Sequence, residues 1–89
     1  MILETDQVAA ELRAFIKSHF KVPDSDRDFT DEVHLFDYGY IDSFGAVELT
    51  SFLEQAFSVK VTESDLITFP LNSIREISTF VVKRKAGEL

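Results

Sequence analysis

Apolar residues recur at helical spacing in three separate segments of this chain, and this pattern limits the possible folds most strongly. Apolar positions three and four residues apart lie on one face of a helix, whereas a half-buried strand alternates. The one short alternating stretch, Val59–Val61, has no partner strand elsewhere in the chain. The spacing predicts helices over about residues 5–19, over residues 43–57 and from Ser73 onward. Their expected buried positions are Val8, Leu12, Phe15, Ile16 and Phe20, then Ala46, Leu49, Phe52, Leu53, Ala56 and Phe57, then Ile74, Ile77, Phe80 and Val81.

Residues typical of helix ends separate these segments. Pro23 follows the first segment, and the long polar loop after it is expected to pack on the core through Phe29, Val33, Leu35 and Phe36. Thr62–Asp65 and Ser73–Glu76 follow the capping-box pattern. The first of these opens a short helix through Ile67, and Gly87 can end the last helix. The prediction is an all-α protein: a small four-helix bundle of three longer helices and one short helix before the last, with a long first loop.

Size and composition are those of one small globular domain. The 89 residues are 45% hydrophobic, and we expect a single domain over residues 1–89 with its core at about 5–85. No stretch is long and apolar enough to span a membrane, and no secretory-type N-terminus is present. The absence of cysteine excludes disulfides and thiol catalysis and fits a cytoplasmic protein. A net charge of −7 argues against nucleic acid or an anionic membrane as the partner and favours basic protein partners.

Asp42 and Ser43 stand where the loop meets the second predicted helix. Their side-chain oxygens can accept hydrogen bonds from unpaired first-turn N–H groups, so both are typical of helix starts. A serine in this position lies at a loop exit, within reach of solvent. The helix end also favours negative charge, and therefore a phosphate ester. The solvent face beyond it carries Phe44 and Val47 with Glu48 and Glu54, which predicts a docking surface beside the serine.

Catalytic and metal sites are not indicated. A nucleophile elbow requires Gly-x-Ser-x-Gly, but Ile41 occupies the position of its first glycine. His19 and His34 form no recognisable arrangement with Ser43. The acidic loop that begins at Asp24 lacks the glycine and glutamate of an EF-hand calcium loop. The chain is therefore predicted not to be an enzyme and to bind no metal.

Nearly the whole chain resembles the acyl and peptidyl carrier proteins. The resemblance covers roughly residues 5–85 and is carried by Phe36, Gly39, Asp42-Ser43, Val47, Glu48-Leu49, Leu53-Glu54, Phe57, Val59, Val61 and Asp65-Leu66. In that family the serine of an Asp-Ser-Leu motif carries covalent 4′-phosphopantetheine derived from coenzyme A. The resemblance implies that Ser43 is this serine and that a phosphopantetheinyl transferase modifies it. One departure is Phe44, which stands where the family usually has leucine.

The resemblance also implies roles for the residues around Ser43. Asp42 would assist at the transferase's metal site. Independently of the resemblance, its side chain can cap the helix once Ser43 is esterified. Phe44, Val47, Glu48, Glu54, Glu63 and Asp65 would contact the loading enzyme and the downstream transferases or synthases.

The expected function is that of a free-standing, monomeric acyl carrier protein in fatty-acid, polyketide or related specialised biosynthesis. The start at Met1 and the absence of linker-like ends favour a free-standing chain. An aminoacyl or peptidyl carrier, including a D-alanyl carrier, is the first alternative. A small acidic helical interaction domain with an incidental Asp-Ser at a helix start is the second.

Overall fold

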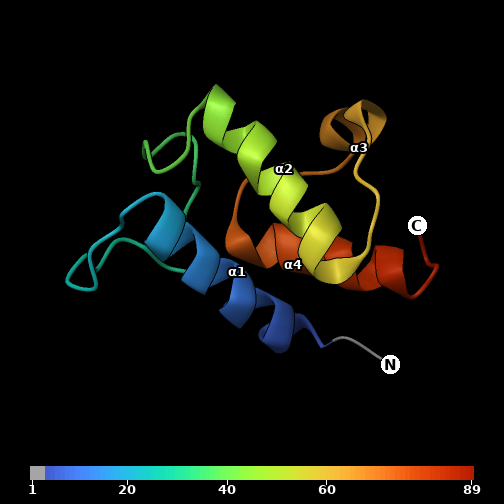
Figure 1. Ribbon diagram of the computed structural model, residues 1–89, viewed down its shortest axis with the longest axis horizontal. Coiled ribbons are helices and arrows are strands. Elements are labelled where there is room, and N and C mark those ends of the chain that lie inside the picture. Colours follow the sequence, from blue (N-terminus) through green and yellow to red (C-terminus); the bar gives the residue numbers. More distant parts are fainter. Residues whose placement is uncertain (1–3) are drawn as a thin grey trace.

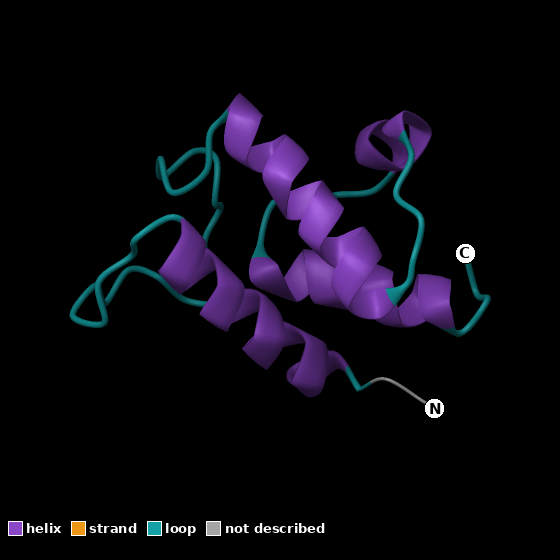
Figure 2. Ribbon diagram, in the orientation of Figure 1, coloured by secondary structure: helices purple, strands orange, loops and turns teal. Residues whose placement is uncertain are grey.

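Four helices in the computed structural model account for the regular structure of residues 4–89, which are the residues that the structure describes. They are α1 (Thr5–His19), α2 (Ser43–Phe57), α3 (Glu63–Thr68) and α4 (Ile74–Lys85) (Figure 1). Figure 2 shows that loops alone connect them, and the described residues form no strand. The prediction of three longer helices, a short helix before the last and a long first loop is confirmed.

The core lies where α1 and α2 pack against α4 (Figure 1). Most of the predicted stripe positions are buried: Val8, Leu12 and Ile16 on α1, Leu49, Leu53 and Phe57 on α2, and Ile74, Ile77, Phe80 and Val81 on α4. Phe15 and Phe20, also predicted as core, are half-buried. Three positions predicted as core on α2 differ. Ala46 and Phe52 are only half-buried, and Ala56 is exposed. Fewer positions of α2 are buried than its apolar residues suggest. The reason is that α4 covers one side of the helix, while the side facing α1 remains partly open to solvent.

The long connection over residues 20–42 is held on the core by four apolar anchors, namely Val22, Phe29, Leu35 and Ile41. Leu35 is fully buried and its N–H donates to the Asn72 carbonyl oxygen at 2.8 Å. Phe29 and Leu35 are buried as predicted, while Val33 and Phe36 are half-buried. The connection therefore reaches α2 in a defined position.

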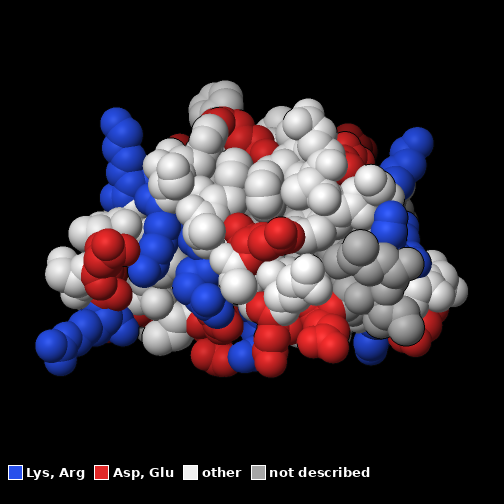
Figure 3. Space-filling model, turned by 60° about the horizontal axis from the view of Figure 1, so that its bottom comes forward, with Lys and Arg blue, Asp and Glu red and all other residues white. Residues whose placement is uncertain are grey.

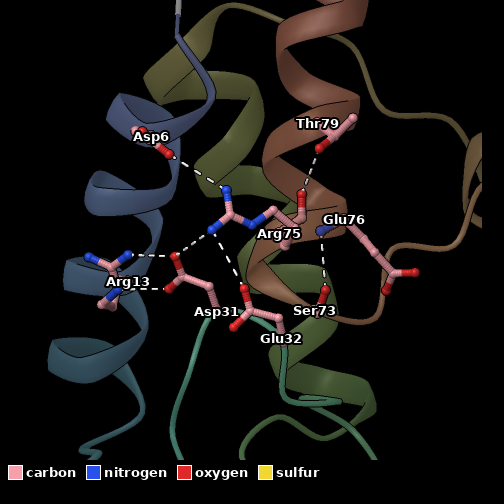
Figure 4. Close-up of polar contacts among 8 residues, drawn as sticks. All are labelled: Asp6, Arg13, Asp31, Glu32, Ser73, Arg75, Glu76 and Thr79. Atoms are coloured by element: carbon pink, nitrogen blue, oxygen red, sulfur yellow. Dashed lines mark hydrogen bonds and ion pairs between the residues drawn. The ribbon is translucent and has the colours of Figure 1, made fainter.

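Arginine side chains from α1 and α4 fasten the same loop (Figure 4). Asp31 accepts two hydrogen bonds from Arg13, at 2.9 and 2.7 Å, and these bonds raise the pKa of the Arg13 guanidinium. Arg75 lies within 3.5–3.7 Å of Asp6, Asp31 and Glu32. Asp31 thus joins both α1 and α4 to the loop.

The two predicted capping boxes differ in detail. At α3, the Thr62 hydroxyl accepts from the Asp65 N–H and the Asp65 carboxylate accepts from the Thr62 N–H, which is the complete box. At α4, Ser73 accepts from the Glu76 N–H, but the Glu76 carboxylate bonds the N–H of Asn72 instead of Ser73. Only half of the second box is therefore present.

Helix α4 ends at the predicted glycine. Gly87 has φ +79°, its N–H donates to the Arg84 carbonyl and the Glu88 N–H donates to the Lys83 carbonyl, which is the pattern of a Schellman motif.

In Figure 3, acidic side chains gather along the middle and lower edge of one face, with basic side chains toward its two ends. No helix within residues 4–89 is long and apolar enough to cross a membrane.

Candidate functional site at the start of helix α2

The loop before α2 turns sharply and delivers Ser43 to the first position of the helix. The Leu35 carbonyl accepts from the N–H groups of both Tyr40 and Ile41, at 2.9 and 3.1 Å. Gly39, at φ +78°, supplies the left-handed conformation of this turn. The side chain of Ile41 is buried, so the next two residues emerge at the surface.

Asp42, rather than Ser43, is the N-cap of α2. Its backbone is extended and its Oδ1 accepts a hydrogen bond of 2.7 Å from the Gly45 N–H. Ser43 is exposed, and no hydrogen bond joins its hydroxyl to another residue of the described range. Esterification of Ser43 would therefore leave the helix cap intact.

Gly45 permits a close approach beneath the serine. A Cβ at this position would lie 2.7 Å from Cε1 of Phe20 and 2.9 Å from Cγ2 of Ile41. Real side chains do not sustain such contacts, so the glycine, despite its cost of about 1 kcal/mol in a helix interior, lets α2 start directly against the loop. The role of Gly45 is therefore close packing.

The side chains that surround Ser43 on α2 are apolar and acidic. Phe44 is 82% exposed and Val47 is 68% exposed, a large apolar surface for two neighbouring side chains. Glu48 is exposed and contacts Nε2 of His19. Glu54 is half-buried, and its carboxylate accepts from the Val61 N–H at 3.0 Å. Glu54 thus holds the connection to α3 in addition to any external role.

The two acidic positions of α3 lie in different environments. Glu63 is exposed in the first turn. Asp65 is buried, and Arg84 donates to it at 2.7 and 3.2 Å. Hydrogen bonds from Thr62 and Arg84 lower the pKa of this carboxyl. Because Asp65 is committed to these internal contacts, we leave it out of the docking surface.

Two exposed apolar residues of α3 were missed in the sequence. Leu66 is half exposed and Ile67 is 87% exposed. Adjacent apolar residues on a two-turn helix point in directions about 100° apart, so both cannot reach the core. That spacing is the signal that identifies them as surface residues.

Hollows lie on both sides of α2. A narrow one of about 40 Å³ lies between α2 and α3 and is lined by apolar residues that include Ala46, Leu53 and Leu66. A wider, shallow groove of about 350 Å³ lies between α1 and α2. Within residues 4–89, no group of histidine, cysteine or carboxylate side chains could hold a metal ion. His34 is engaged locally, since its Nδ1 accepts from the Asp37 N–H.

A small helical bundle that presents a free serine hydroxyl at the start of a helix suits a protein that bears a covalently attached group. Residues 10–81 match the family model described as "Phosphopantetheine attachment site", so the chain belongs to this family of phosphopantetheine carrier proteins. No curated protein matches the chain. The structure fits the group: the N–H groups of Ser43 and Phe44 begin a helix and have no carbonyl partner in it, so they are available to a phosphate.

Proposed function

We propose that Ser43 is the attachment residue for 4′-phosphopantetheine and that the chain serves as an acyl carrier protein. The observation that carries this proposal is the exposed hydroxyl of Ser43 at the first position of α2, next to a cap supplied by Asp42. The family match supplies the cofactor, and the apolar side chains around Ser43 support an acyl cargo.

The residues at the site hold the ester and leave the helix undisturbed. In the transfer reaction, the Ser43 oxygen forms a bond to the phosphorus that bears the pantetheine of coenzyme A. The pyrophosphate linkage breaks, adenosine 3′,5′-bisphosphate leaves, and the hydroxyl proton passes to a base of the transferase. The positive end of the α2 dipole then stabilises the phosphodiester charge. When bound, the group supplies a thiol that holds acyl chains as thioesters.

The proposed docking surface consists of Phe44, Val47, Glu48 and Glu63. All four are exposed, and they combine apolar area with negative charge. Apolar side chains at the centre of an interface contribute most of its affinity, while charges at its rim mainly set the association rate. Enzymes with a basic rim around an apolar patch are therefore the partners that this surface fits.

The test is the intact mass of the protein after incubation with coenzyme A and a promiscuous phosphopantetheinyl transferase. We expect the wild type to gain one phosphopantetheine and Ser43→Ala to gain none. Ser51→Ala, which removes another exposed serine of α2, is the matched control and should be modified fully. The proposal would be overturned if Ser43→Ala were modified, or if the folded wild type were not modified.

A further inference from the structure

The groove between α1 and α2 is a hollow beside Ser43 whose chemistry is not explained by the core. Its base is formed by Phe15 and Phe52, half-buried rings that stack with centroids 4.0 Å apart and planes 12° apart. His19 continues the stack, with its ring centroid 4.9 Å from that of Phe15. An aromatic surface that stays partly open to solvent is typical of a binding groove.

The helical ridge that carries Ser43 leads into this groove. Residues four apart are neighbours along a helix, so Ser43, Val47, Ser51 and Gln55 form one row. The last three of these line the groove. At 1.5 Å per residue the row from Ser43 to Gln55 is about 18 Å long, which is comparable with the extended length of a phosphopantetheine chain.

The hollow on the other side of α2 is too small for the same occupant. Its volume of about 40 Å³ is far below the roughly 300–1,000 Å³ of typical small-molecule sites. The groove on the α1 side, at about 350 Å³, falls within the range of small-molecule sites.

We propose that the phosphopantetheine arm on Ser43 lies along the groove between α1 and α2, over the stacked rings of Phe15 and Phe52. This inference rests on the proposed attachment at Ser43. The methyl and methylene groups of the arm lie over the two rings. The amides of the arm meet the polar edge of the groove, where Ser51, Gln55 and Glu48 are exposed.

The test compares ¹H–¹⁵N and aromatic NMR spectra of the apo and holo protein, with intact mass recorded on the same samples. Holo formation should shift the amides of Ser51 and Gln55 and the ring signals of Phe15 and Phe52. Shifts confined to the first turn of α2, or centred on Leu66 and Leu71 of the opposite hollow, would overturn the inference. The mass separates the two proposals, because a fully modified protein without groove shifts refutes only this one.

Two further measurements locate the arm. Ser51→Tyr fills the groove and should abolish the shift at Gln55, whereas Ser64→Tyr, the same change at an exposed α3 serine, should preserve it. A nitroxide on the thiol of wild-type holo protein should broaden the signals of Ser18 and Ala56, which border the adjoining surface of Phe15 and Phe52. An unchanged shift at Gln55 in folded Ser51→Tyr, or no broadening at these positions, would contradict the placement.

Discussion

Among single residues, Asp42 and Ser43 differ in their role at the start of α2. The Asp42 carboxylate accepts a hydrogen bond from the first turn of α2, and the Ser43 hydroxyl remains exposed. Asp42→Ala removes the cap and should lower the free energy of unfolding by about 1 kcal/mol. Chemical denaturation checks this. Asp42→Asn, which keeps an acceptor oxygen, should retain most of the stability, and equal stability of Asp42→Ala and wild type would contradict the capping role.

The same residue is expected to affect modification. If the Asp42 carboxylate assists the transferase, Asp42→Asn should be modified more slowly than wild type even though its helix is capped. The rate of phosphopantetheine transfer is the measurement. Equal rates for the wild type, Asp42→Asn and Asp42→Ala would restrict Asp42 to its structural role.

The contact of Asp65 with Thr62 and Arg84 makes stability depend on pH. Hydrogen bonds lower the pKa of this carboxyl in the folded state, so its contribution is complete above the unfolded pKa and is lost as pH falls through the folded one. Asp65→Asn should lower the free energy of unfolding by roughly 1–3 kcal/mol at neutral pH. The difference from wild type should shrink below about pH 4. A difference independent of pH, measured by denaturation from pH 7 to 3, would contradict this account.

At the scale of elements, the attachment of the long loop to α1 and α4 depends on Asp31. Its side chain is 15% exposed and receives two hydrogen bonds from Arg13, whereas Asp24 is 97% exposed and contacts only Lys17, at 3.2 Å, among the described residues. Exposed ion pairs contribute little, and partly buried bidentate ones contribute more. Asp31→Asn should therefore destabilise the protein by about 1–3 kcal/mol.

Asp24→Asn is the matched control and should change stability by less than about 0.5 kcal/mol. Thermal and urea denaturation of the two variants provide the comparison. Equal effects would mean that the ion pairs at Asp31 do not hold the loop.

The helices could be predicted from the sequence because their apolar spacing and end residues agree. The starts of α2 and of the short α3 follow from their N-cap residues, Asp42 and Thr62, and their lengths follow from the spacing of the apolar residues. What could not be predicted depends on contacts between segments distant in the chain. The approach of Phe20 to Gly45, the pairing of Asp65 with Arg84 and the open side of α2 each require the packed bundle.

At the scale of the whole molecule, the net charge of −7 should steer partners with basic surfaces toward α2. Glu48→Lys is expected to slow phosphopantetheine transfer, most strongly at low ionic strength, because salt screens exposed charges. Glu88→Lys makes the same change in net charge far along the chain and is the matched control. Initial rates at low and high salt are the measurement, and identical rate profiles for the two variants would show that net charge alone matters.

Fragmentation mass spectrometry of the loaded protein tests whether phosphopantetheine is attached to Ser43. Trypsin leaves residues 28–60 as one peptide, which contains Ser43, Ser51 and Ser58, so fragment ions within this peptide must locate the group. We expect every fragment that contains Ser43 to carry the added mass and fragments with only the other two serines to lack it. The added mass on Ser51 or Ser58, or outside this peptide, would contradict attachment at Ser43.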